Sequence, residues 1–280
     1  MTYLNPKHLF KYFSLKVFNR KINIDTENLN ISFGSKVKNS CDLRSVNSAQ
    51  VAKLKALIQD RGMLVIPAHQ VLTEAEQIQI TKYFGKTERN PVSYIGTHSK
   101  VKGETAIHDN TYLSSELWHN DNPCLKNPSH ISVFQMVDSA SQNWETDFIS
   151  LHDICSNITE EIKLKWNSIY IMYSGSDVTH PLLWIHPFTG RQSIYFDFRF
   201  VKQIFNICKN TGEILIKKNN EIISKLHLLF SSNKAIYNHK WSQGDVIIID
   251  NYAVSRRKTL KSSYNSSALL RTTTTTGIYF

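Results

Sequence analysis

The chain has 280 residues, of which 41% are hydrophobic and 20% are charged, and its formal net charge is +10. A chain of this length can bury a large core without disulfides or metals, and its apolar runs, such as Val246 to Ile249, are too short to span a bilayer. The composition therefore excludes a membrane-spanning class and predicts one soluble globular domain over residues 1–280. Four scattered cysteines without paired spacing indicate free thiols.

The N-terminal region and the distribution of charge limit location and partners. Residues 1–20 mix basic and aromatic side chains without the apolar core and cleavage site of a signal peptide, which favours a cytoplasmic location. The Lys and Arg residues are spread along the chain and form no basic arm, so we do not expect a nucleic-acid partner. An anionic small-molecule substrate explains the excess positive charge better. Nothing in the sequence indicates the oligomeric state.

The first half of the chain predicts two helices around one short strand. The spacing of apolar residues predicts a helix that begins at Ser48 and ends at Gly62, followed by a strand over 63–66. Thr73 and Glu76 form a capping-box pattern that opens a second helix. Residues 90–111 have no clear period and are expected to form a long loop.

The second half predicts mostly short strands. We expect strands over residues 131–137, 168–174, 193–198, 246–250 and 268–278, a helix after Thr159, and a polar helical region over 213–230. Residues 1–42 are interpreted as an N-terminal extension and 199–240 as a helical insert. This pattern predicts an α+β, mainly β protein built on a β-sandwich or jelly roll.

The pair His119 and Asp121 has the spacing of two metal ligands. Residues two apart on a strand point to the same face. A non-haem Fe(II) oxygenase binds its metal with two His and one carboxylate, which leaves free positions for cosubstrate and O2. For an isolated His-x-Asp we would favour an ordinary hydrogen-bonded pair, and the surrounding motifs decide between the two interpretations.

Four longer motifs occur in a characteristic order. They are Ser115-Glu-Leu-Trp-His-Asn-Asp121, Asn143-Trp-Glu-Thr-Asp-Phe148, His180-Pro-Leu-Leu-x-x-His-Pro-x-Thr-Gly190 and Trp241-x-x-Gly-Asp-Val-x-x-x-Asp-Asn251. In this order the chain, from about Leu43 to Gly277, resembles the taurine dioxygenase / chlorophenoxyacetate dioxygenase family of Fe(II)/2-oxoglutarate-dependent oxygenases. The resemblance implies a double-stranded β-helix, or jelly roll, with flanking helices, and Fe(II) and 2-oxoglutarate as cofactors. It implies that His119 and Asp121 are metal ligands and that Thr146 contacts the cosubstrate, whereas a structural strand Thr is the alternative for Thr146.

The sequence departs from the family pattern at the third metal ligand. The family places a His about five residues after Asp-Asn, and here that place holds Arg256. A guanidinium stays protonated and offers no lone pair, so it cannot bind Fe(II). Three interpretations of Arg256 stay open: it binds an anionic substrate, it pairs with Asp121, or it turns outward while His119, Asp121 and waters hold iron weakly.

A second departure lies near the C-terminus. The family pattern Arg-x-x-x-Arg is replaced by Ser267-Ala-Leu-Leu-Arg271, which lacks the first Arg, the partner of the 2-oxoglutarate carboxylate. Arg271 is still expected to point into the pocket and bind a carboxylate, as a catalytic or a cosubstrate-binding residue. We interpret His180 and His186 as structural, and we do not expect His239 to replace Arg256.

Two hypotheses of function follow. The leading one is an oxidoreductase: an Fe(II)/2-oxoglutarate-dependent dioxygenase that acts on a small, anionic or amino-acid-derived molecule in a biosynthetic pathway, with Arg256 and Arg271 in its catalytic site. The alternative is a degenerate member without redox activity, which serves as a small-molecule-binding or regulatory protein or as a non-redox enzyme using the old pocket. The fold alone does not decide between them.

Overall fold

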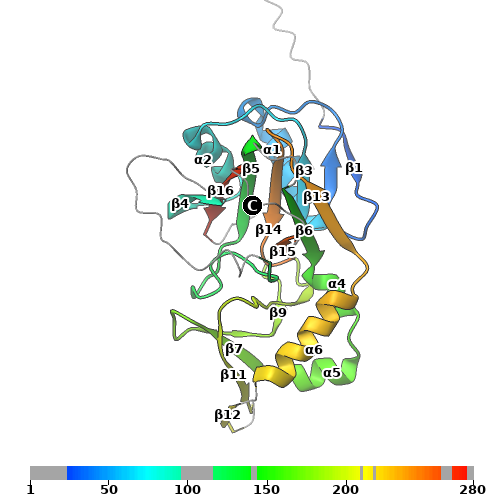
Figure 1. Cartoon of the computed structure of the whole chain (residues 1–280), viewed down its shortest axis with the longest axis vertical. Coiled ribbons are helices and arrows are strands. Elements are labelled where there is room, and N and C mark those ends of the chain that lie inside the picture. Colours follow the sequence, from blue (N-terminus) through cyan, green and yellow to red (C-terminus); the bar gives the residue numbers. More distant parts are fainter. Residues whose placement is uncertain are drawn as a thin grey trace, which may run out of the picture.

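Two β-sheets pack against each other and form the core of the molecule (Figure 1). The computed structural model describes residues 24–95, 116–139, 144–208, 211–216, 219–259 and 267–275. The larger sheet has seven strands, in the spatial order β1 (Thr26–Asn28), β2 (Ser35–Val37), β3 (Met63–Ile66), β14 (Val246–Asp250), β5 (Ile131–Ser139), β16 (Ser267–Thr274) and β4 (Thr87–Ile95). The smaller sheet has the order β13 (Ile236–Lys240), β6 (Glu145–Ser150) and β15 (Val254–Lys258). The mainly β, jelly-roll fold class predicted from the sequence is confirmed.

Strand β14, formed by the apolar run 246–250, is buried on both of its faces. Ile247 and Ile249 point between the two sheets, where they pack with Phe134 and Phe148. Ile248, between them in sequence, points to the opposite face of the large sheet. A strand that is buried on both faces needs a continuous apolar run instead of an alternating one, which is the pattern that this segment has.

Helices α1 (Ser48–Arg61) and α2 (Glu74–Lys82) cover the outer face of the large sheet. Helix α1 ends at Gly62, whose φ of 73° lies in the left-handed region that favours glycine. The capping box of α2 is present: Thr73 accepts from the backbone of Glu76, and the Glu76 carboxylate accepts from the backbone of Thr73. The end of α1 and the start of α2 thus follow from local sequence, as predicted.

A second layer of structure lies below the sandwich in Figure 1 and has its own apolar core. It contains α4 (Leu151–Ser156), α5 (Glu160–Trp166), β7 (Ile169–Tyr173), β8 (Thr179–Pro181), β9 (Leu183–Ile185), β10 (Gln192–Ile194), β11 (Val201–Ile207), β12 (Ile214–Ile216) and α6 (Asn219–Ser232); a short 3-10 turn, η1 (Leu43–Ser45), precedes α1. Within the described residues, no helix is both long enough and apolar enough to cross a membrane.

Several sequence expectations were wrong in part. Residues 90–95, expected in a loop, belong to β4, which pairs with β16 at the edge of the large sheet and with no other strand that the structure describes. Side chains on both faces of such an edge strand are partly exposed, so the strand shows no alternation of apolar residues. The range 213–230, expected to be helical throughout, begins with the strand β12 before α6. The wider range 199–240, interpreted as a helical insert, also contains the strands β11 and β13. The strand expected over 193–198 ends at Ile194. The rest of the expected loop and residues 1–20 lie outside the described residues.

Candidate functional site

His119 and Arg256 lie opposite each other in an isolated antiparallel bridge. The backbone N–H of His119 donates to the carbonyl of Arg256 at 2.9 Å, and the N–H of Arg256 donates to the carbonyl of His119 at 3.1 Å. Directly opposed residues of an antiparallel pair carry their side chains on the same face. The single bridge replaces the longer strand expected around His119, and it brings His119 and Arg256 side by side.

Asp121 receives two guanidinium groups on one carboxylate oxygen. Arg256 Nη2 lies 2.7 Å from Oδ1 of Asp121, and Arg271 Nη1 donates to the same oxygen. The other oxygen, Oδ2, accepts from Ser132 Oγ at 2.5 Å. Asp121 is 1% exposed. Of the three interpretations of Arg256 left open by the sequence, the ion pair with Asp121 is therefore the arrangement present.

Arg256 itself is buried and stacks on an aromatic ring. It is 5% exposed, and its guanidinium carbon lies 4.6 Å from the centroid of the Phe134 ring. Its second terminal nitrogen, Nη1, is buried and has no hydrogen-bond partner among the residues that the structure describes. Arg271 is more open: it donates through Nε to Ser93 Oγ at 2.8 Å, and its side chain is 22% exposed.

Burial and neighbouring charges shift the pKa values of Asp121 and His119. Burial alone would raise the pKa of Asp121, but the positive charges of Arg256 and Arg271 outweigh it and hold the pKa well below its usual range. Burial lowers the pKa of His119 well below its usual range, and the charges of Arg199 and Arg256 lower it further. Asp121 is therefore ionised and His119 is neutral. Its Nδ1 donates to the carbonyl of Leu117 at 2.7 Å, which leaves the lone pair on Nε2.

Asn120, between His119 and Asp121, is held by hydrogen bonds to residues that the sequence did not single out. Asn120 donates through Nδ2 to the carbonyls of Asn251 and Val254 at 2.7 and 2.8 Å. Its backbone N–H donates to Asp197, and its carbonyl accepts from Arg199, which forms an ion pair with Asp197 at 2.8 Å. The only sequence signal was the Asp-x-Arg spacing, which is too common to single out.

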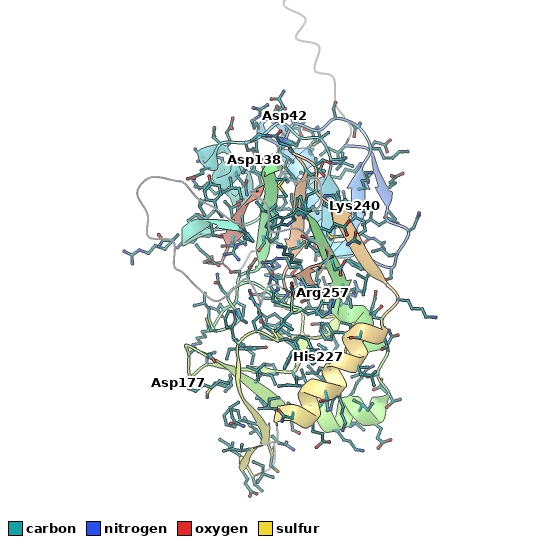
Figure 2. All side chains as sticks on the ribbon, in the orientation of Figure 1. Asp42, Asp138, Asp177, His227, Lys240 and Arg257 are labelled. Carbon is teal, nitrogen blue, oxygen red and sulfur yellow. The ribbon has the colours of Figure 1, made fainter. Side chains whose placement is uncertain are left out.

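Arg257, the neighbour of Arg256, faces a different environment. It lies where the sandwich meets the lower layer (Figure 2), 3.1 Å from Asp147 through Nε and 4.5 Å from the centroid of the Trp118 ring. Its side chain is 34% exposed. The two consecutive arginines therefore belong to separate ion pairs, which makes Arg257 a matched control for Arg256.

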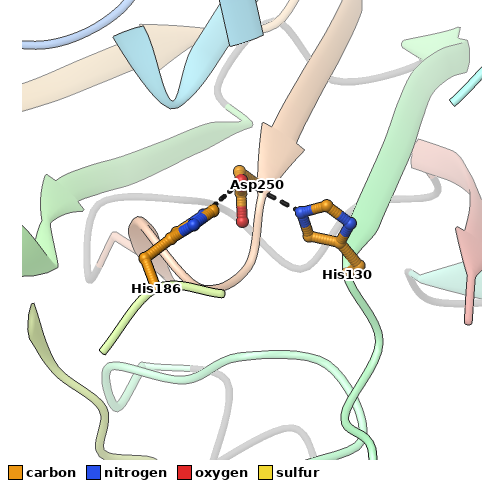
Figure 3. Close-up of side chains that lie close together, drawn as sticks. All are labelled: His130, His186 and Asp250. Atoms are coloured by element: carbon orange, nitrogen blue, oxygen red, sulfur yellow. Dashed lines mark hydrogen bonds and ion pairs between the residues drawn. The ribbon is translucent and has the colours of Figure 1, made fainter. Parts of the chain in front are cut away.

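A second group of possible metal ligands consists of His130, His186 and Asp250 (Figure 3). Their ligand atoms lie within 4.8 Å of one another, and all three residues are buried. Asp250 Oδ2 lies 3.1 Å from Nε2 of His130 and 2.9 Å from Nε2 of His186. The sequence predicts a structural role for His186, and Asp250 stands out there only as part of the motif that ends at Asn251.

The hydrogen bonds of His186 decide which nitrogen carries its proton. Nδ1 accepts from the backbone N–H groups of Phe188 and Thr189, both at 3.2 Å, so the proton of the neutral ring lies on Nε2 and is donated to Asp250. The other oxygen of Asp250 accepts from the backbone of Tyr252 at 2.8 Å. A metal at this place would need a lone pair on Nε2, which carries the proton in this hydrogen-bonded arrangement.

The remaining candidates have partners of their own. Thr146 accepts through Oγ1 from Trp241 Nε1 at 2.9 Å, and it lies opposite Lys258, two residues along the strand from Arg256. His180 contacts the carbonyl of Leu125 at 2.9 Å, and His239 pairs with Asp245 at 3.2 Å. The structure thus brings His119, Asp121, Arg256 and Arg271 together and leaves the hydroxyl of Thr146 bound to Trp241.

Comparison with known proteins identifies relatives of low sequence identity. A family model described as taurine catabolism dioxygenase TauD, TfdA family matches residues 25–271. The putative alpha-ketoglutarate-dependent sulfonate dioxygenase of Schizosaccharomyces pombe is 20% identical over 244 residues, 78% of this chain and 61% of that protein. The (S)-phenoxypropionate/alpha-ketoglutarate-dioxygenase of Sphingobium herbicidovorans is 23% identical over 268 residues, 84% of this chain and 89% of that protein. The chain therefore spans less than two thirds of the length of the first of these relatives.

Solved structures share the fold. The structure of AAD-2 in complex with Mn(II) and N-oxalylglycine aligns with a TM-score of 0.76 at 17% identity, over 91% of this chain and 98% of that one. A taurine dioxygenase from Burkholderia xenovorans aligns with a TM-score of 0.72 at 20% identity, over 91% of each chain. At these identities the likeness establishes the jelly-roll fold.

Proposed function

The chain belongs to the TauD, TfdA family of taurine catabolism dioxygenases, and we propose that it is an iron-free member of this family. In this proposal the protein binds a small anionic molecule beside Arg256 and Arg271 and performs no redox chemistry. Arg256 and Arg271 bind the ligand, and Arg256 stands where the family has its distal metal ligand. The cytoplasmic location and the biosynthetic setting remain predictions.

The observation that carries the proposal is the contact between Arg256 and Asp121. The carboxylate oxygen that would bind a metal accepts from two guanidinium groups, one of them at 2.7 Å. An arginine offers no lone pair, and His119 and Asp121 alone are one protein ligand short of the set that a non-haem Fe(II) site needs. Fe(II) would also have to displace both cations from a buried carboxylate. The residues present therefore do not fit the metal.

The His130, His186 and Asp250 group does not compensate for this loss. Its geometry satisfies the distance requirement of a metal site, but the proton of His186 is fixed on the nitrogen that faces Asp250. Metal binding would require the two backbone N–H groups at Nδ1 to face a ring nitrogen that must then carry a proton. We propose that this group stabilises the fold beside the pocket.

An anionic ligand is supported by the charge of the site. Arg256 and Arg271 bring two positive charges to the single negative charge of Asp121. A buried excess charge is unfavourable unless an opposite charge compensates it. The relatives are named for sulfonates and phenoxy acids, which are also small organic anions.

Anaerobic titration with Fe(II) and 2-oxoglutarate tests the proposal. We expect the wild-type protein to show no visible charge-transfer band and to retain no iron after desalting, because no facial ligand set is available. Arg256→His restores a third ligand and is expected to create the band. Arg257→His, at the neighbouring ion pair, is expected to leave the protein without it. Stoichiometric iron retention with the band in the wild-type protein would refute the proposal.

A further inference from the structure

A cavity of about 480 Å³ opens at the side of the sandwich. It is lined by residues of β13, the edge strand of the small sheet, and of β2 and β3 in the large sheet. Protein cavities of roughly 300–1,000 Å³ hold small organic molecules. We propose that this cavity binds a small organic carboxylate with a flat apolar body, and that Lys36 binds the carboxylate group.

The register of the large sheet places Lys36 on its inner face. Lys36 pairs with Val65 of β3, and Val65 pairs with Ile247 of β14. Val65 and Ile247 belong to the core between the sheets, and paired residues of neighbouring strands share a face. Val37, the next residue of β2, packs on the outer face instead. The side chain of Lys36 is nevertheless only partly buried, because the cavity lies over it.

The ammonium group of Lys36 has no ion pair or hydrogen bond with another residue in the described ranges. Glu27, which pairs with Lys36 through the backbone of β1, is exposed. The carboxylate of Asp245 also lines the cavity, but both of its oxygens already accept from backbone N–H groups, of Ala68 and Ser242, at 3.0 Å. A partly buried ammonium group without a counter-charge favours an anionic ligand.

The cavity also offers surface for an apolar body. Pro67, Ala68 and Tyr237 line it, and each of them is exposed or partly exposed. An aromatic ring can stack on Tyr237 and bury apolar surface that water otherwise covers. Lys240 lies on β13 at the rim, where its side chain is 79% exposed and lies 3.7 Å from Glu145 (Figure 2). It adds a second positive charge, weakened by solvent.

Asp245 holds the two walls of the cavity together. It accepts from Ala68, in the turn after β3, and lies 3.2 Å from Nε2 of His239 on β13. The hydroxyl of Tyr237 lies 3.1 Å from Nδ1 of the same histidine. Ala68 has a φ of 52°, which is uncommon for a residue other than glycine, and its hydrogen bond to Asp245 holds it there. A cavity that is formed before binding loses little conformational entropy when a ligand enters.

This cavity is separate from the site around Asp121. From Val65 the row of paired residues continues through Ile247 and Phe134 to Arg271. Four steps between neighbouring strands separate β2 from β16, which is roughly 19 Å at the usual strand spacing. Ile247 and Phe134 are buried and fill the space between. Binding at the cavity therefore does not depend on the proposed iron-free site.

Three small ligands separate the charge from the apolar body. Benzamide has the shape of benzoate without its charge, and acetate has the charge without the ring. Dissociation constants are measured by NMR titration on the full chain, from the amide signals of Ala68 and His239 in the two walls. We expect benzoate to bind about fivefold more tightly than benzamide, because its hydrogen bond to Lys36 is charge-assisted. We expect it to bind at least about tenfold more tightly than acetate, which buries no ring.

Substitutions locate the contacts. Lys36→Gln is expected to weaken benzoate about fivefold and to remove its preference over benzamide. Lys240→Gln should have a smaller effect, because its side chain is 79% exposed. Lys225→Gln is the control, since this lysine forms an exposed pair with Glu221 on α6 and should leave the affinity unchanged. Arg256→Gln should also leave binding at the cavity unchanged.

The signals that move upon titration distinguish the two sites. Equal affinities for benzoate and benzamide, or a benzoate affinity that Lys36→Gln does not change, would overturn the inference. Shifts that are absent at Ala68 and His239 but present around Asp121, and that Arg256→Gln abolishes, would overturn it as well. That last result would leave the proposed function intact, because it would place benzoate beside Arg256.

Discussion

The carboxylate of Asp121 pairs with both Arg256 and Arg271, so loss of the carboxylate and loss of one arginine should have different effects on stability. Removing the carboxylate leaves the buried Arg256 and the partly exposed Arg271 facing each other without a counter-charge, whereas removing one arginine leaves a balanced pair. We expect Asp121→Asn to lower the free energy of unfolding by about 3–5 kcal/mol and Arg256→Gln by only about 1–2 kcal/mol. Urea unfolding measures both, and a larger loss for Arg256→Gln would contradict the charge balance described above.

The contribution of the Asp250 carboxylate to the stability of the protein should depend on pH, which gives a second test at a single residue. Burial would raise its pKa, but His130 and His186 outweigh burial and hold it below its usual range. A carboxyl group whose pKa is lowered by folding stabilises the protein above its unfolded pKa, about 3.9, and this stabilisation is lost as the pH falls through that region.

The substitution Asp250→Asn replaces a carboxylate oxygen by an amide NH2 group, which then faces groups that donate to Asp250 in the wild-type protein. We expect it to cost about 3 kcal/mol at neutral pH. The difference from the wild-type protein should shrink below about pH 4, where the carboxyl of the unfolded chain gains a proton while that of the folded protein is still ionised, and it should vanish as the pH falls through the lowered folded pKa. Asp177→Asn is the control, since its side chain is 95% exposed and its pair with Lys202 contributes little. A difference that stays constant with pH would show that Asp250 is not ionised.

At the scale of elements, the turn before β14 explains a glycine of the sequence motif. Gly244 has a φ of 88°, and a Cβ atom built on it would lie 2.0 Å from the carbonyl oxygen of His69. We expect Gly244→Ala to destabilise the protein by about 3 kcal/mol or more. Gly175→Ala is the matched control, because Gly175 also has a positive φ, 85°, but no atom within 4 Å of the added Cβ. Equal melting temperatures for the two variants would refute the steric explanation.

Elements defined by local chemistry could be predicted, and elements defined by distant partners could not. The Thr73 capping box and the left-handed Gly62 are encoded within a few residues, and both are present. Strand β4 depends on its pairing with β16, more than 170 residues later in the chain, and leaves no local period. The sequence therefore indicated the helices around the sandwich better than the edge of its large sheet.

At the scale of the whole molecule, the site lies where the two layers meet. Strands β15 and β16 bring Arg256 and Arg271 from the sandwich, and the Asp197–Arg199 pair holds the Asn120 backbone from the lower layer. The sequence motifs predicted the fold and placed Arg256 near Asp121. They could not predict that Arg271 shares the same oxygen or that Arg199 joins the site, because these contacts form only when the layers pack.

The most direct test of the iron-free site is a crystal structure obtained after anaerobic soaking with Mn(II) and N-oxalylglycine, the pair bound in the related AAD-2 structure. We expect no anomalous peak next to Asp121, and Arg256 Nη2 should remain at hydrogen-bond distance from Asp121 Oδ1. A manganese ion bound by His119 and Asp121, with Arg256 turned away, would contradict the proposal.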